Sequence, residues 1–256
     1  MKFLLQPVRN RVTVPKGLIP RSSSQGAHMH IPDGFIGPGT SAVTGAVAVG
    51  AIAVCVRRAG IDLDEKRAPL AGLAAAFIFA VQMLNFPVAA GTSGHLLGGV
   101  LAAVLVGPWA GALCVSVVLI VQALMFADGG LSALGLNIMN MAVIGALVGY
   151  ALFAVIRGVL PRNRRSVVLA AGLAAGVAPN LGALGFVVEY SFGGNGAAPL
   201  GTVLAAMLGV HSLIGIGEGL ITAMAVSSVL AVRPDLVHGA SHLTVEPVVV
   251  RESVGV

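Results

Sequence analysis

Long apolar stretches alternate with short polar, glycine- or proline-containing breaks along most of the chain. Most of these stretches are close to the roughly 20 residues that an α-helix needs to cross the hydrocarbon core of a bilayer. The third is shorter, and we expect it to be tilted or partly re-entrant. The pattern predicts an all-α integral membrane protein with a bundle of about seven transmembrane helices, at 40–57, 68–88, 94–106, 108–127, 136–157, 167–189 and 200–232.

The composition supports this class. Hydrophobic residues make up 57% and charged residues 10% of the 256-residue chain, whereas about a quarter of the residues of a soluble domain are charged. The 35 glycines and many alanines suit helices that pack closely in lipid. Cys55 and Cys114 lie in separate apolar stretches, so we expect buried small side chains rather than a disulfide or a metal-binding pair.

The net charge of +5 comes entirely from residues 1–28, which hold five basic side chains and no acid. The rest of the chain carries equal numbers of basic and acidic residues, so the charge does not indicate nucleic-acid binding. Residues 1–28 also lack an apolar stretch long enough for a signal peptide. We predict a disordered basic extension at 1–28, followed by a single transmembrane domain at 29–256.

Basic residues between the apolar stretches predict the orientation. By the positive-inside rule, the two loops that carry them face the cytoplasm, which places residue 29 outside and the C-terminus inside. An extension with five uncompensated positive charges on the outer face contradicts this rule. We therefore expect the mature chain to start at Met29, with 1–28 removed or assigned to the protein in error. The loop residues are Arg57, Arg58, Lys66, Arg67, Arg157, Arg162, Arg164 and Arg165.

A chain that begins at Met29 offers three nitrogens to one metal ion: the α-amine of Met29, the backbone amide of His30 and the His30 imidazole. They form two fused chelate rings close to a plane, and a fourth nitrogen would complete a square. Square-planar nitrogen coordination suits Ni2+ or Cu2+, and Co2+ can be accommodated. The simpler interpretation is a polar leader before the first helix.

His95 is the candidate fourth ligand, because the predicted topology places it at the outer mouth of the third segment. Thr92 and Ser93 precede it and are expected to hydrogen-bond there or to cap a helix that begins near His95. The alternative is a histidine that only makes a packing hydrogen bond.

Four further polar residues lie deeper in the apolar segments. Asn137 and Asn140 are three residues apart and share a helix face, and His211 and Glu218 are two turns apart on one face. Ionisable groups at membrane depth are costly and often functional. His211 and Glu218 could form a second metal or proton site, and the alternative for all four is interhelical hydrogen bonding.

Four stretches together resemble the CbiM/NikM family over nearly all of 29–256. They are Met29-His30-Ile31-Pro32-Asp33-Gly34-Phe35, Gly91-Thr92-Ser93-Gly94-His95, the run from Gln122 through Asp128-Gly129-Gly130 to Asn140-Met141-Ala142, and the run from His211 to Gly217-Glu218-Gly219-Leu220-Ile221-Thr222. Members of that family are the substrate-binding S components of prokaryotic energy-coupling factor (ECF) transporters.

The resemblance implies uptake of Co2+ or Ni2+ across the cell membrane, with cobalt commonly used for cobalamin biosynthesis. It implies a six-helix S-component core with one added N-terminal helix. It also implies metal ligands at Met29, His30 and His95, with Asp33, Thr92, Ser93, Asn137, Asn140, His211 and Glu218 as supporting residues.

The sequence contains no ATP-binding Gly-x-x-x-x-Gly-Lys-Ser/Thr motif, so we expect a transporter component and not an enzyme. The resemblance implies a transmembrane coupling subunit and two cytoplasmic ATPase subunits as partners, often with a small accessory membrane protein. Faces such as Ala48, Ala51 and Cys55, or Ala68, Ala71 and Ala75, are candidates for docking the coupling subunit. The alternatives are a self-contained secondary metal carrier and an intramembrane metalloenzyme.

Overall fold

The computed structural model describes residues 30–63, 65, 67–83, 86–89, 92–196 and 198–243. The predictions for residues 1–28 and for Met29 fall outside these residues and stay predictions. The elements are α1 (Pro38–Asp62), α2 (Ala68–Gln82), β1 (Phe86–Ala89), β2 (Thr92–Gly94), α3 (Gly99–Val106), α4 (Pro108–Met125), α5 (Leu134–Asn137), the π-helix η1 (Ile138–Val148), α6 (Gly149–Val159), α7 (Arg164–Gly193), α8 (Leu200–Val232), and the 3-10 turns η2 (Pro234–Leu236) and η3 (His238–Leu243).

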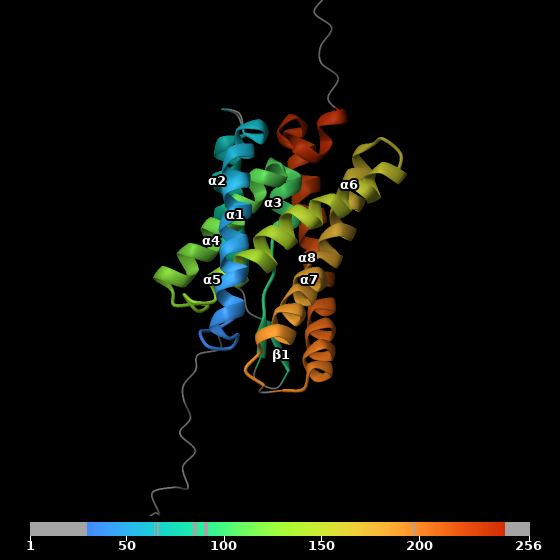
Figure 1. Ribbon diagram of the computed structural model, residues 1–256. Helices are drawn as coiled ribbons and strands as arrows, with labels where there is room; N and C mark the ends of the chain where they lie inside the picture. Colours follow the sequence, from blue (N-terminus) through green and yellow to red (C-terminus); the bar gives the residue numbers. More distant parts are fainter. Residues whose placement is uncertain are drawn as a thin grey trace, which may run out of the picture.

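The predicted helical bundle is confirmed, because helices occupy each of the seven predicted stretches (Figure 1). Within the described residues, five helical spans are long and apolar enough to cross a membrane. They are Pro38–Gly60, Pro108–Met125, Leu134–Val159, Arg164–Gly193 and Leu200–Val232. The fifth predicted stretch is one continuous span built from α5, η1 and α6. Helices α2 and α3 are shorter.

The segment between α2 and α3 differs from the prediction. Helix α2 ends at Gln82, and β1 and β2 pair as antiparallel strands in which Phe86 lies opposite Gly94. Pro87 explains the change, because proline has no backbone N–H and restricts the residue before it to extended conformations. The predicted helix over 68–88 is therefore too long at its C-terminal end.

The third helix begins later than predicted. Residues 95–98 form neither helix nor strand, and α3 starts only after Gly98, which has the positive φ of 75° that glycine tolerates. Thr92 and Ser93 belong to β2, so the prediction that they cap a helix near His95 is wrong. The expectation that this segment is too short for a full helical crossing is confirmed, since α3 has 8 residues.

Helix α3 forms the centre of the bundle, and all of its residues are buried. It packs against α2, α4, η1, α6, α7 and α8. The buried face of α7 is a row of alanines (Ala170, Ala171, Ala174, Ala175 and Ala178). Small side chains let these backbones approach closely, which is how helices associate without a hydrophobic driving force in lipid.

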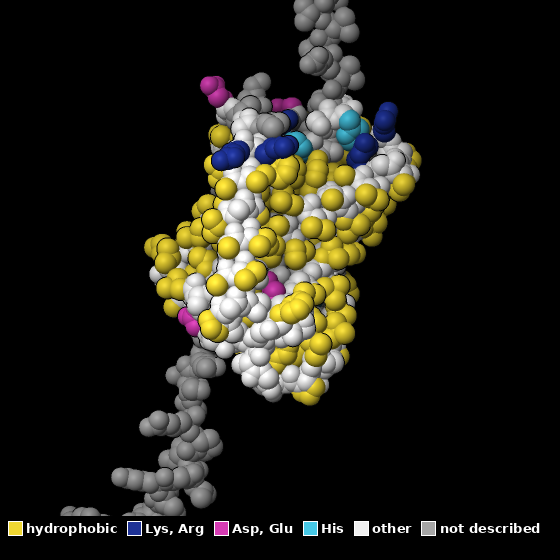
Figure 2. Space-filling view, viewed as in Figure 1, with side chains coloured by type: hydrophobic (Ala, Val, Ile, Leu, Met, Phe, Trp, Pro, Cys, Tyr) yellow, Lys and Arg dark blue, Asp and Glu magenta, His cyan; other side chains and the backbone are white. Residues whose placement is uncertain are grey.

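The described basic residues gather at one end of the molecule (Figure 2), where α1, α6 and α8 end and α7 begins. Below them, hydrophobic side chains cover most of the visible face (Figure 2). The N-terminal residues before α1 and the turns η2 and η3 lie at opposite ends of the bundle (Figure 1). An odd number of crossings and a polarised charge distribution are therefore features of the fold.

Both cysteines are buried, as predicted, and they lie in separate hydrophobic clusters of the bundle. Cys55 and Ala48 are buried against the rest of the bundle. The proposed docking face at Ala48, Ala51 and Cys55 is therefore wrong, because helix packing inside this chain already uses it.

Candidate metal-binding site

The described chain starts with a segment, residues 30–37, that contains a turn at Asp33 and Gly34 and is held against the end of α7. The backbone N–H of Gly37 donates to Gly193 O at 2.6 Å, and Asn195 N–H donates to Phe35 O at 3.2 Å. The Phe35 ring stacks on Phe186, with ring centroids 5.9 Å apart. This segment is thus anchored by main-chain hydrogen bonds and an aromatic contact before α1 begins.

The loop between α4 and α5 holds the segment from the other side. Gly130 N–H donates to Ile31 O at 2.9 Å, and the side chain of Asn137 accepts from Ile31 N–H at 3.1 Å. The Asn137 amide also donates to Ile31 O at 3.4 Å. Asp33 accepts hydrogen bonds from the backbone N–H and hydroxyl of Ser132. Ile31, the residue next to His30, is therefore held by two residues, Gly130 and Asn137, that are distant from it in the sequence.

Two glycines let this loop approach so closely. Gly129 has a φ of 85°, and a Cβ there would lie 2.8 Å from the His30 Cβ. A Cβ on Gly130 would collide with the backbone nitrogen and carboxylate of Asp33. The Gly129-Gly130 pair is thus required by contact with the N-terminal segment.

His30 and His95 meet in the interior. Their ring centroids are 4.6 Å apart, and each residue is only 6% exposed. Asp128 completes the cluster, since its Oδ2 lies 3.1 Å from His30 Nδ1. Within the described part of the chain, the buried His30 Nε2 has no hydrogen-bond partner, although a buried polar atom normally has one. The arrangement is a buried pair of imidazoles beside one carboxylate.

The His95 side is held by hydrogen bonds to the residues that follow it. Its Nδ1 lies 3.0 Å from Leu96 O, and because a carbonyl only accepts, this nitrogen carries the proton. In the neutral ring Nε2 is then the unprotonated nitrogen, and neutral imidazole is the form that binds metals. Gln82 donates to Leu97 O at 2.7 Å.

Glu218, a residue of α8, holds the same backbone segment after His95. It accepts from the N–H groups of Leu97 and Gly98 at 2.8 and 2.9 Å, and it is 1% exposed. Glu218 therefore positions Leu97 and Gly98, which follow His95. His211 has a different partner, with its Nδ1 2.7 Å from Met207 O within α8. Glu218 and His211 therefore have different hydrogen-bond partners.

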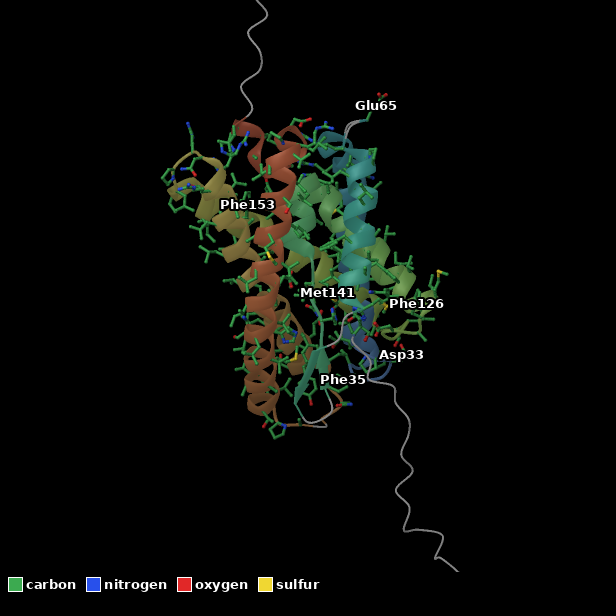
Figure 3. The ribbon with its side chains drawn as sticks, turned by 180° about the vertical axis from the view of Figure 1, so that it is seen from behind. Asp33, Phe35, Glu65, Phe126, Met141 and Phe153 are labelled. Carbon is green, nitrogen blue, oxygen red and sulfur yellow. The ribbon has the colours of Figure 1, made fainter. Side chains whose placement is uncertain are left out.

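Of the remaining predicted residues, Asn140 donates to Glu189 at 2.7 Å and links η1 to α7. This is the interhelical hydrogen bond that the alternative interpretation predicts. Thr92 and Ser93 lie in β2, and their side-chain positions lie outside the described residues. Asp33 and Phe35 lie toward the end of the bundle opposite Glu65 (Figure 3).

Sequence reasoning missed Asp128 and Glu189 as neighbours of the predicted residues. Asp128 was visible as an acid directly before two glycines in a loop on the His30 side. Glu189 lies at the end of an apolar stretch without such a signal.

Side chains alone do not complete a metal site in the described part of the chain. No group of three or more His, Cys, Asp or Glu residues converges there in a geometry that holds an ion. A complete site built on His30 and His95 thus needs donors of another kind, such as backbone or terminal nitrogens.

The chain is similar to known metal transport proteins. A family model described as "Cobalt uptake substrate-specific transmembrane region" matches residues 30–236. A putative metal transport protein of Haloquadratum walsbyi is 41% identical over 82% of this chain and 93% of its own length. A putative fused nickel transport protein of Archaeoglobus fulgidus is 39% identical over 82% of this chain and 68% of its own length.

A solved structure supports the same relationship. The crystal structure of a truncated transition metal transporter superposes with a TM-score of 0.71 at 33% identity, covering 79% of this chain and 99% of that one. The chain therefore belongs to the CbiM family, whose model describes a substrate-specific membrane component of cobalt uptake.

Proposed function

We propose that the protein is the substrate-binding membrane component of an energy-coupling transporter that imports Co2+ or Ni2+. The observation that carries the proposal is the meeting of His30 and His95, with ring centroids 4.6 Å apart in a buried site. Two histidines from separate elements bring imidazole nitrogens to one buried place. Cobalt and nickel are suitable ions for such a site, because imidazole binds both.

The ligand set follows from the N-terminal segment. With Met29 as the first residue, its amine, the His30 amide nitrogen and His30 Nδ1 chelate the ion, and His95 Nε2 provides the fourth nitrogen. Asp128 Oδ2 lies 3.1 Å from that same Nδ1, so the carboxylate sits beside the bound cation. It offsets the positive charge in an interior that otherwise disfavours it.

The charge distribution supports the direction of transport. By the positive-inside rule, the end with the arginines faces the cytoplasm, so His30 and His95 face the outside. In the proposed cycle, the ion is captured at the outer face, the bundle reorients through a transmembrane coupling subunit and two ATPase subunits, and the ion is released inside. A small accessory membrane protein completes the complex.

Calorimetric titration with Ni2+ and Co2+ tests the binding site. The chain starting at Met29 is expected to bind tightly, and both His95→Ala and a chain in which Met29 is preceded by a glycine lose binding. His211→Ala is the matched control, because the hydrogen bond of His211 Nδ1 to Met207 O stays within α8, and this variant should bind like the parent. Equal affinity with and without the added glycine contradicts the chelate.

The pH dependence of metal affinity provides a second test of the site. Protons compete for both imidazoles and the amine, and chelation must also expel an amide proton. Affinity is therefore expected to fall from neutral to mildly acid pH, with the ligand-field absorption of square-planar Ni2+ lost in parallel. Equal occupancy at both pH values contradicts a nitrogen-rich site.

Uptake into vesicles tests the transport role. Accumulation of Ni2+ or Co2+ is expected only when the coupling and ATPase subunits are present with ATP. Uptake driven by this chain alone would instead indicate a self-contained secondary carrier.

A further inference from the structure

A groove of about 760 Å³ runs along the outside of the bundle between α7 and α8. Its volume is within the range of about 300–1,000 Å³ that is common for small-molecule sites. It is remote from His30 and His95, which do not line it. The lining residues are Arg164, Arg165, Val168, Leu169, Gly172, Leu173, Gly176, Val177, Gly215, Ile216, Gly219, Leu220, Ala223, Ser227, Leu230 and Ala231.

Four glycines form the floor of this groove. Gly172 and Gly176 of α7 lie directly against Gly215 and Gly219 of α8, and a Cβ on Gly219 would lie 2.7 Å from Gly172 O. Backbones in direct contact leave no side chains to fill the space outside them. The side chains of the flanking leucines, valines and isoleucine then form the two sides of the groove.

The walls face outward. Leu173 is 50% and Ile216 64% exposed, so the groove is apolar and open to the surrounding hydrocarbon. Its polar groups are concentrated at one end, where Arg164 and Arg165 lie beside Leu230 and Ala231. No acidic residue is among those that line it. A ligand that fits has one anionic end and a long apolar remainder.

The length of the groove distinguishes between two possible occupants, a lipid and a transmembrane helix of a partner protein. From Arg164 to Val177 the helix rises roughly 20 Å, at about 1.5 Å per residue. This is about half of the 40–45 Å thickness of a bilayer with its headgroups, or one leaflet. A transmembrane helix of a partner protein would cross the whole hydrocarbon core, about 30 Å, and would extend beyond the groove.

We propose that the α7–α8 groove binds one anionic phospholipid from the leaflet at the basic end of the molecule. The phosphate lies between Arg164 and Arg165, and one acyl chain lies along the glycine floor. Basic pockets between transmembrane helices recognise anionic lipid headgroups in this way. The lipid would brace α7 and α8, the two helices that carry Glu189 and Glu218. The proposal depends neither on metal binding nor on a partner subunit.

Native mass spectrometry of the protein, released from bilayers of equal phosphatidylglycerol and phosphatidylcholine, tests this. One phosphatidylglycerol is expected to stay bound, with a roughly 10- to 30-fold preference from two basic contacts. Arg164→Gln with Arg165→Gln should abolish the preference. Arg57→Gln with Arg162→Gln removes the same charge at the same end but outside the groove, and should keep it. Equal retention in both double variants would overturn the proposal.

A second pair of variants tests the acyl-chain part of the site. Ser227 is exposed and lines the groove, so Ser227→Phe should fill it and lower retention with both arginines intact. Ser228 is also exposed but does not line the groove, and Ser228→Phe should retain the lipid. Unchanged retention in Ser227→Phe would overturn the groove assignment. So would efficient cross-linking of Ile216→Cys to the coupling subunit in the assembled transporter, since it would show a protein occupant.

Discussion

Replacing Asn137 with alanine is expected to loosen the N-terminal segment and to weaken metal binding without touching the metal ligands. Asn137 accepts from Ile31 N–H at 3.1 Å and donates to Ile31 O at 3.4 Å. Ile31 O keeps a second partner, the N–H of Gly130 at 2.9 Å. The main loss is therefore one acceptor for the Ile31 N–H.

The magnitude follows from that single orphaned donor. A backbone N–H left unsatisfied in a buried site costs about 1–3 kcal/mol. If this cost falls on the metal-bound conformation, the dissociation constant rises by roughly 5- to 150-fold, since each 1.4 kcal/mol is a factor of about ten. Asn137→Asp keeps an acceptor for Ile31 N–H, so we expect a smaller loss.

The assay is calorimetric titration of Ni2+ into the chain starting at Met29, with thermal unfolding measured in parallel. Asn140→Ala is the matched control, because Asn140 is equally buried, lies three residues further along the same helical span, and bonds to Glu189. It should lower the thermal stability but leave the metal affinity of the folded protein close to that of the parent.

Two results would refute the reasoning. One is an Asn137→Ala protein that binds Ni2+ as tightly as the parent. The other is an equal loss of affinity in Asn140→Ala, which would indicate a general effect of bundle stability and no specific anchoring of residue 31.

Three further predictions concern other contacts. Gly130→Ala should lower the melting temperature and metal affinity together, by about 1–3 kcal/mol of overpacking, because the new methyl group collides with Asp33. Glu218→Gln should lower the melting temperature, since an amide NH2 then faces a backbone N–H at a cost of about 1–3 kcal/mol. Partial desolvation lowers the pKa of His242, and the nearby charge of Arg157 adds to this. The unfolded chain then binds the proton more readily, so stability should fall as pH falls below about 6.5, and unfolding curves from pH 7.5 to 5.5 measure it.

Controls accompany these three. Gly72→Ala adds a methyl group in open space and should be neutral or slightly stabilising, and a loss equal to that of Gly130→Ala would contradict the steric argument. Glu65→Gln, at an exposed position, should leave the melting temperature unchanged. In His242→Gln the pH dependence should become shallower, and an identical slope in variant and parent would exclude His242 as its source.

The sequence by itself determined the class of protein and the ends of most helices. Apolar stretches bounded by Pro108, Pro161 and the arginine pairs could be recognised because a membrane requires a helix of a minimum length with its backbone fully hydrogen-bonded. His30 and His95 could also be selected as candidate ligands, since polar residues are rare in such a chain. Their pairing followed from counting crossings, which places both on one side of the membrane.

Tertiary structure decided which groups actually meet. The backbone before α3 is fixed by Gln82, which donates to Leu97 O, and by Glu218, which accepts from Leu97 N–H, and no local pattern predicts bonds between elements so far apart. The contact between Asp128 and His30 likewise exists only because Gly129 and Gly130 let two loops touch. Periodicity reports the burial of a single helix, whereas a binding site is made by close approach between elements, and that depends on how the whole bundle packs.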